Sequence, residues 1–299
     1  MADTLKAYEA RLTNPNDVAG AYAFCQALAD SHYENFPVAS LLLPKRLRKH
    51  VAALYAFARI ADDMSDEPEY EGRRRECLLN WRSMLADTGK RPPSHPVFLA
   101  LGATLKELDL PKEPFDDLLS AFLQDTEKNR YETYDEVVDY CRRSANPVGR
   151  IVLMIHGYRD EQLFRWSDAI CTALQLANFW QDVGRDWHAG RLYVPRETYE
   201  STGASVADLD AGRLSPEWAD AFVHCVARTR ECFERGRYVC DGVRGRLALE
   251  LRLTWLGGAR VLDRVELLRT HRRLDRPSLG ARDVPSILWH AARWTRVAA

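Results

Sequence analysis

Two sets of polar residues recur at helical spacing, and each set ends in a pair of aspartates four residues apart. The first set lies in "YAFARIADDMSD" and consists of Tyr55, Arg59, Asp62 and Asp66. Steps of four and three keep residues on one helix face, where carboxylates four apart are separated by about 6 Å along the axis. Such a pair could bind hydrated Mg²⁺ ions, whose shells are completed by water and phosphate oxygens. A solvated acidic helix end would look similar, and the neighbouring Asp63 and Glu67 could be surface residues.

The second set makes coincidence a poor explanation. It lies in "QLANFWQDVGRDW" and consists of Gln175, Asn178, Asp182 and Asp186. Two D-x-x-x-D helices suggest an antiparallel pair that faces one cavity. Four carboxylates cannot converge on a buried space without cations, because repulsion and desolvation would cost too much. Those cations would bind an anion rich in oxygen, for which diphosphate is the natural candidate, with Arg59 and Arg191 nearby in sequence to hold it.

The elements that position these residues are predicted to be helices. Apolar residues recur at intervals of three and four over 51–62, 115–128, 137–158, 166–183, 221–239 and 247–268. Short breakers separate these segments, and no pair of alternating strands flanks a hairpin turn. The chain has no linker, low-complexity tract or fixed-period repeat. We therefore predict one all-α domain over residues 1–299, with about eight to ten helices around a common interior.

Composition narrows the class of protein. The chain has 299 residues, 46% of them hydrophobic, and a formal net charge of -1, so no overall field attracts nucleic acid. Its seven cysteines form no C-x-x-C pair, which favours a reducing cytoplasm over disulfides or a zinc site. No secretion signal or apolar run of ~20 residues is present, and we expect a cytoplasmic protein. After Lys128 the chain contains arginine but no lysine. This bias could reflect the base composition of the genome, or it could mark a surface that binds phosphate or a membrane.

These motifs resemble those of a known family. The chain is similar to the squalene and phytoene synthases, the head-to-head branch of the all-α isoprenoid diphosphate enzymes. The resemblance runs colinearly through "SHYENFPVAS", "YAFARIADDMSD", "CRRSANPVG", "LQLANFWQDVGRDW" and "GRLYVP". It implies an isoprenoid-synthase-type helical bundle around a central cavity, with Mg²⁺ and diphosphate at one end and long prenyl chains in its apolar part.

The resemblance also implies roles for individual residues. The metal ligands would be Asp62, Asp66, Asp182 and Asp186. The residues that contact diphosphate or complete the metal site would be His32, Arg59, Asn178 and Arg191. Tyr55 and Gln175 would line the reaction centre. Aromatic side chains that could face a carbocation, or be ordinary core, are Phe36, Tyr55, Phe57, Phe122 and Phe179.

Four positions depart from the family pattern. Relatives usually read C-x-Y-x-A-G-x-V-G where this chain has "CRRSANPVG", so Arg143 replaces the tyrosine and Asn146-Pro147 replaces a small, glycine-containing pair. In the family that tyrosine helps to remove a proton while two farnesyl units join. Arginine stays protonated at any workable pH and cannot act as that base. Gln181 stands where many relatives have arginine.

This pattern, with "ENFPVAS" and "NFWQDV", resembles one subfamily, the hydroxysqualene synthases of bacterial hopanoid and squalene biosynthesis. The resemblance implies a Mg²⁺-dependent prenyl diphosphate lyase that ionises presqualene diphosphate, rearranges the cation and adds water. Asn146 or Asn178 would position the water, and Arg143 would border the cavity. The implied partners are a presqualene diphosphate synthase, a flavin-dependent reductase and, because substrate and product are lipids, the inner membrane as a peripheral contact.

Two other functions stay open. A complete squalene or phytoene synthase would condense two allylic diphosphates, against which Arg143 argues. A non-catalytic assembly protein with the synthase fold belongs to a different class, and such relatives typically lose aspartates from the metal motifs. All four aspartates are present here, which favours an enzyme.

Overall fold

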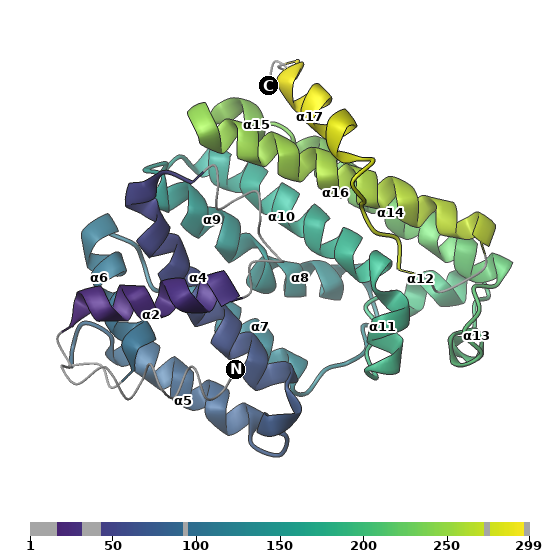
Figure 1. The fold of residues 1–299 in the computed structure, drawn as a ribbon. Helices are drawn as coiled ribbons and strands as arrows, with labels where there is room; N and C mark the ends of the chain where they lie inside the picture. Colours follow the sequence, from purple (N-terminus) through teal and green to yellow (C-terminus); the bar gives the residue numbers. More distant parts are fainter. Residues whose placement is uncertain (1–16, 32–42, 92–94, 272–275, 296–299) are drawn as a thin grey trace. The chain divides into compact units, whose positions relative to one another are not determined.

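Helices make up nearly all of the regular structure, as the spacing of apolar residues predicts. The computed structural model describes residues 17–31, 43–91, 95–271 and 276–295. Over these residues there are fifteen α-helices, ten of them with ten or more residues, and no strand beyond two isolated β-bridges (Figure 1). The all-α prediction is confirmed. None of the described helices is both long and apolar enough to cross a bilayer.

The chain divides into two compact units. The first comprises residues 1–127 and 150–159, and the second comprises residues 128–149 and 160–299. The helix α9 (Asn146–Ile155) carries the chain from the second unit into the first. One domain over the whole chain stays a prediction, and each unit is described by itself.

The first unit is built around the helix that carries the first pair of aspartates. Its elements are α2 (Val18–Ser31), α4 (Lys45–Asp66), η2 (Pro68–Tyr70), α5 (Arg74–Asp87), α6 (Pro96–Leu108) and α7 (Glu113–Asp125). The central helix α4 packs against α2, α5, α6 and α7. Phe57 of α4 is fully buried and meets the rings of Phe98 and Phe115 edge to face, with centroids 6.0 and 5.5 Å away. This aromatic core holds one face of α4 rigid.

The second unit is built around the helix that carries the first half of the second set, Gln175 and Asn178. Its elements are α8 (Tyr134–Ser144), α10 (Glu161–Gln181), α11 (Val183–His188), α12 (Arg196–Ser201), α13 (Val206–Asp210), α14 (Pro216–Gly236), α15 (Val239–Gly242), α16 (Gly245–His271) and α17 (Val284–Ala292). Asp160 caps α10 by accepting a hydrogen bond from the Leu163 amide at 2.9 Å. A Cβ at Gly236 would lie 2.5 Å from the backbone nitrogen of Ile170, so this glycine allows α14 to approach α10 closely.

Two of the predicted helices are interrupted. The segment 137–158 forms α8 and α9, which meet at Ala145, because Pro147 lacks an amide hydrogen and cannot donate to the carbonyl four residues earlier, at Arg143. The segment 166–183 lies mostly in α10, which ends at Gln181, and α11 begins at Val183. Asp182 lies at this second junction, with φ -98° and ψ 9°.

Candidate active site

The first aspartate stripe, which consists of Tyr55, Arg59, Asp62 and Asp66, occupies the C-terminal half of α4. Arg59 lies at its centre and forms ion pairs within the same helix. Its guanidinium is 3.5 Å from Asp62 and 2.5 Å from Asp63. The side chain of Asp63 is 20% exposed and that of Asp62 is 46% exposed. Asp63 is therefore not the surface residue that the sequence allowed, and it belongs to the charged cluster around Arg59.

The end of α4 is electrostatically unfavourable for a helix. Its final turn carries Asp63 and Asp66, and it contains no basic residue. Carboxylates at a helix C-terminus lie beside the negative end of the helix dipole, which destabilises the helix by some tenths of a kcal/mol each. Burial raises the pKa of the Tyr55 hydroxyl, and Asp63 and Asp62 raise it further, against the opposing effect of Arg59. The carboxylates around Arg59 outnumber this single arginine, so the acidic cluster is suited to cations.

The second aspartate stripe, which consists of Gln175, Asn178, Asp182 and Asp186, continues across the junction between α10 and α11. The amide of Asp182 donates to the carbonyl of Asn178 at 2.9 Å, and the amide of Asp186 donates to the carbonyl of Asp182 at 2.9 Å. Successive bonds of this kind keep the three side chains on one side of the chain despite the interruption. Asn178 is exposed, whereas Gln175 and Asp186 are half-buried.

Asp182 is held by an arginine that sequence analysis did not identify. Its side chain is 12% exposed and forms an ion pair with Arg276, in which Nε binds one carboxylate oxygen and Nη2 lies 3.3 Å from the other. The side-chain amide of Gln181 donates to the carbonyl of Pro277, the next residue along the chain. Residues 276 and 277 therefore lie against Gln181 and Asp182. The guanidinium of Arg276 is bound to the Asp182 carboxylate, which we expect to bind metal.

Arg191 lies beside the end of the second stripe. Its amide donates to the carbonyl of Asp186 at 2.7 Å, across a turn in which Gly190 has φ +80°. A positive φ is readily adopted by glycine, which lets the chain turn back immediately after α11. The next four residues are buried and fix this turn. The backbone of Arg191 thus lies next to Asp186, the last residue of the second stripe.

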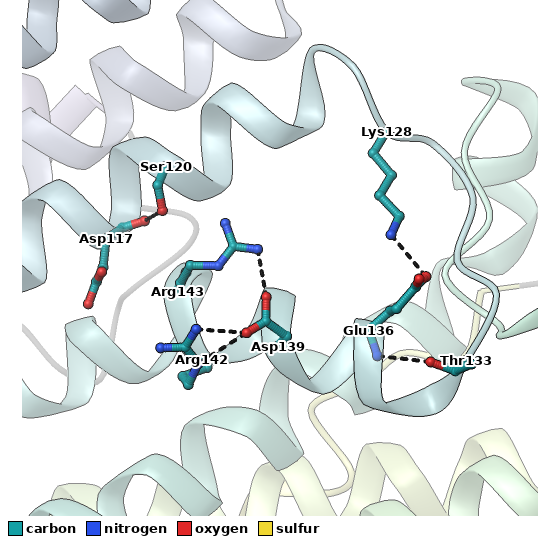
Figure 2. A network of polar contacts seen from close by, with 8 residues as sticks. All are labelled: Asp117, Ser120, Lys128, Thr133, Glu136, Asp139, Arg142 and Arg143. Atoms are coloured by element: carbon teal, nitrogen blue, oxygen red, sulfur yellow. Dashed lines mark hydrogen bonds and ion pairs between the residues drawn. The ribbon is translucent and has the colours of Figure 1, made fainter.

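Arg143 is a half-buried, ion-paired side chain. Its side chain is 17% exposed and its guanidinium donates to Asp139 at 3.0 Å, and Arg142 donates to the same carboxylate at 2.7 Å (Figure 2). Hydrogen bonds from Arg142 and then Arg143 hold the pKa of Asp139 below its usual value. Asp139 thus stays ionised beside both arginines, and this stretch of α8 offers hydrogen-bond donors and a permanent cation in place of the family's tyrosine.

The remaining predicted site residues differ in how deeply they are buried. Asn146 is 7% exposed, and its side-chain oxygen accepts a hydrogen bond from Thr172 at 2.9 Å, which ties the start of α9 to α10. Phe57 and Phe179 are buried in the aromatic cores of their units, whereas Phe122 is half-buried. His32 and Phe36 lie outside the described residues.

The donor set suits a hard cation. Both stripes offer carboxylate oxygens, and the second stripe adds the side-chain amide oxygens of Gln175 and Asn178; these are ligands that Mg²⁺ prefers, and no cysteine is among them. In the described parts of the chain no three His, Cys, Asp or Glu side chains already converge as a metal centre. The guanidinium on Asp182 shows that this carboxylate attracts a positive charge. A single cavity between the stripes stays a prediction, because the stripes belong to different units.

The pairing of Asp182 with Arg276 gives a prediction about stability. We expect Asp182→Asn and Arg276→Gln each to lower the free energy of unfolding by about 1 kcal/mol, and the double variant to lose little more than either single one. Urea denaturation of the metal-free protein measures this coupling. Arg185 is the matched control, because its guanidinium is 71% exposed and 4.0 Å from the same carboxylate, so Arg185→Gln should show almost no coupling. Purely additive losses at Asp182 and Arg276 would contradict the pairing.

Comparison with known proteins gives the family. Residues 29–283 match squalene/phytoene synthase. The hydroxysqualene synthase of Rhodopseudomonas palustris is 38% identical over 73% of this chain and 74% of its own, and that of Zymomonas mobilis is 38% identical over 68% of each chain. Among solved structures, squalene synthase HpnC from Alicyclobacillus acidocaldarius is 40% identical, with a TM-score of 0.80 over 85% of this chain and 95% of its own. This chain belongs to the squalene/phytoene synthase family.

Proposed function

We propose that this protein is a hydroxysqualene synthase, which converts presqualene diphosphate and water to hydroxysqualene and diphosphate. The observation that carries the proposal is the 38% identity to two hydroxysqualene synthases over two thirds or more of their length. The state of Arg143 supports it, because the residue at the family's tyrosine position is a cation paired with Asp139. Such a group cannot accept the proton that is lost when two farnesyl units join.

The two aspartate stripes would hold Mg²⁺ through Asp62, Asp66, Asp182 and Asp186. When bound, the metal would neutralise charge on the departing diphosphate and so assist cleavage of the C–O bond. Arg59 and Arg191 would donate hydrogen bonds to the same diphosphate oxygens, and His32 and Asn178 would complete this site. For Arg59 this requires a change of partner, since its guanidinium now contacts Asp62 and Asp63.

The proposed reaction involves no net oxidation or reduction, so it needs no redox cofactor. Diphosphate leaves with the bonding electron pair, and the cyclopropylcarbinyl cation rearranges to the 1,1′-linked skeleton. The oxygen of water then bonds to one carbon and releases a proton. Tyr55, whose hydroxyl is uncharged at neutral pH and whose pKa is raised by burial, would line the reaction centre without adding charge, and Gln175 would lie beside it. Of the two asparagines, Asn178 would orient the water, since its side chain is exposed, whereas the side-chain oxygen of Asn146 accepts a hydrogen bond from Thr172.

The proposal implies specific neighbours in metabolism. A presqualene diphosphate synthase must supply the substrate, and a flavin-dependent reductase would remove the hydroxyl group from the product. We propose a cytoplasmic protein that contacts the inner membrane peripherally, since both lipids partition into bilayers.

One rival function has a specific observation in its favour. The HpnC protein that is 40% identical to this chain is named a squalene synthase. A complete squalene synthase would join two farnesyl diphosphates and reduce the product with NADPH. Incubation of the purified protein with presqualene diphosphate, with and without Mg²⁺ and NADPH, separates the two functions when the products are analysed by mass. We expect hydroxysqualene in the presence of Mg²⁺ whether or not NADPH is added; squalene formed only with NADPH would establish the rival.

The ion pair at Asp182 gives a prediction about metal binding. Arg276 must leave the carboxylate before a metal ion can bind there, so Arg276→Gln should tighten the binding of Mg²⁺ alone about tenfold. Calorimetric titration of the metal into the protein without substrate measures this affinity. Arg185→Gln removes an equal charge from a position 4.0 Å from Asp182 and should change the affinity far less. Weaker binding by Arg276→Gln would mean that this arginine helps to hold the metal instead of competing with it.

A further inference from the structure

Exposed large apolar side chains concentrate near the C-terminal end of the described chain. Nine such side chains are exposed among the described residues, and four of them lie between residues 279 and 289. These four are Leu279, Val284, Leu288 and Trp289, of which Trp289, at 56%, is the most exposed of all nine. Single exposed apolar residues are common on protein surfaces, but a cluster of this kind marks an interaction surface.

The cluster is formed mainly by one side of α17. With 3.6 residues per turn, the exposed apolar residues cover an arc of about 140° on this helix. This arc, the apolar face of α17, consists of Val284, Pro285, Leu288, Trp289 and Ala292. The side toward α16 carries the buried Asp283 and Ala291, and the third side carries Ser286, His290 and Arg293. The helix therefore has a packed side, an exposed apolar side and a polar side.

Contacts at both ends hold this exposed face in place. Before the helix, Asp283 accepts hydrogen bonds from Arg264 at 2.6 and 2.7 Å and from the amide of Gly280 at 2.8 Å. After the helix, Trp294 donates to Asp241 at 2.8 Å and meets the ring of Trp255 edge to face. These contacts and the packing of α17 against α16 (Figure 1) hold the helix in place within the second unit. We call the apolar face of α17 held in this way the ridge.

The stretch of chain that carries the ridge has more positive than negative residues. Between residues 276 and 295 the positive residues are Arg276, Arg282 and Arg293, whereas the single acidic residue, Asp283, is buried and paired with Arg264. Arg293 lies 4.0 Å over the ring of Trp289, at the boundary between the apolar and polar sides. The whole chain has a formal net charge of -1, so this positive charge is local. Apolar residues with a tryptophan and a rim of arginine are the composition of helices that lie in the interface of anionic membranes.

We infer that the apolar face of α17 docks on the surface of a bilayer that contains anionic phospholipid. Leu288 and Trp289 would enter the boundary between head groups and acyl chains, and Arg282 and Arg293 would contact lipid phosphates. The inference rests on the proposed function, since presqualene diphosphate and hydroxysqualene are long prenyl lipids that must be drawn from and returned to a membrane. A second copy of the chain fits less well, because a nine-residue helix is only ~13 Å long and stable complexes bury about 800 Å² on each partner.

Sedimentation with lipid vesicles tests this inference directly. Phosphatidylcholine vesicles with and without phosphatidylglycerol are mixed with the wild-type protein and with the double variant Leu288→Ser, Trp289→Ser. We expect the double variant to bind the anionic vesicles at least about tenfold more weakly. The matched control is Leu79→Ser with Val223→Ser, two side chains 44% and 39% exposed elsewhere on the protein, which should bind within about twofold of wild type.

A second pair of variants tests the charged rim. Arg282→Gln with Arg293→Gln should weaken binding to anionic vesicles and leave the weak binding to neutral vesicles unchanged, and added salt should mimic this loss. Equal binding by wild type and the Leu288, Trp289 variant, or no binding by wild type, would overturn the inference. A variant that binds vesicles normally but changes from dimer to monomer in analytical ultracentrifugation would assign the ridge to a second copy instead.

The vesicles contain no substrate, so their binding is independent of turnover. Activity with presqualene diphosphate dispersed in detergent should be equal in wild type and in the Leu288, Trp289 variant, since α17 has no role in the proposed chemistry. If the wild-type protein bound anionic vesicles but formed no hydroxysqualene, the proposed reaction would fail while the docking surface stood.

Discussion

Replacing Asp62 or Asp182 by asparagine should lower kcat on presqualene diphosphate by about a hundredfold to a thousandfold. Asparagine keeps the shape of the side chain and one oxygen but loses the negative charge that binds a divalent cation. The loss should persist at saturating substrate, because charge neutralisation acts on the bond that breaks. Steady-state kinetics with excess Mg²⁺ measures it, and circular dichroism checks that each variant remains folded.

The control for this prediction is Asp220→Asn on α14. Asp220 is exposed and lies in neither aspartate stripe, so its replacement should leave kcat unchanged. Full activity of the Asp62 and Asp182 variants, or undiminished activity of the wild-type protein in excess chelator, would refute the assignment of these carboxylates to a metal.

The second large effect concerns farnesyl diphosphate as the only prenyl substrate. We expect less than about a thousandth of the rate seen with presqualene diphosphate, because joining two farnesyl units requires a base that takes a proton. Arg143 lies at the position of the family's tyrosine, is 17% exposed and is paired with Asp139, so it stays protonated. Opening a preformed cyclopropyl diphosphate needs no such base at this position. Product analysis by mass after incubation with farnesyl diphosphate, Mg²⁺ and NADPH measures the difference.

Efficient formation of squalene in that incubation would restore the rival function, which the name of the HpnC relative supports. A matched control distinguishes an effect of residue 143 itself from a general effect of the ion pairs that Arg142 and Arg143 form with Asp139. Arg142 shares the carboxylate of Asp139 but is 63% exposed, so Arg142→Gln should leave both rates within about twofold of wild type.

The sequence was sufficient for the all-helical class and for the helical spacing of the two aspartate stripes, because both depend on residues close together along the chain. Successive backbone hydrogen bonds join Asn178, Asp182 and Asp186 although α10 ends between them, so the four-residue spacing survives the interruption. The break of the predicted helix 137–158 had a visible cause in Pro147, whose effect on the preceding residues is local.

The contacts that the sequence did not reveal are of two kinds. Arg276 pairs with Asp182 across 94 residues of chain, and no periodicity within a segment records such a contact. Asp63 is adjacent to Asp62 and was considered a surface residue, yet its side chain is the less exposed of the two because Arg59 turns toward it. Helical spacing brings both Asp62, three residues from Arg59, and Asp63, four residues from it, within reach of this arginine, and spacing alone does not show which of the two forms the closer pair.

In the proposed reaction, water captures a cation derived from presqualene diphosphate. The most direct measurement is mass analysis of the alcohol formed from presqualene diphosphate in ¹⁸O-labelled water, with Mg²⁺ and without NADPH. We predict one labelled oxygen in every molecule of hydroxysqualene, together with the release of unlabelled diphosphate, because the C–O bond to diphosphate breaks and a new bond to solvent oxygen forms. An unlabelled alcohol, or no C30 alcohol at all under these conditions, would contradict the account.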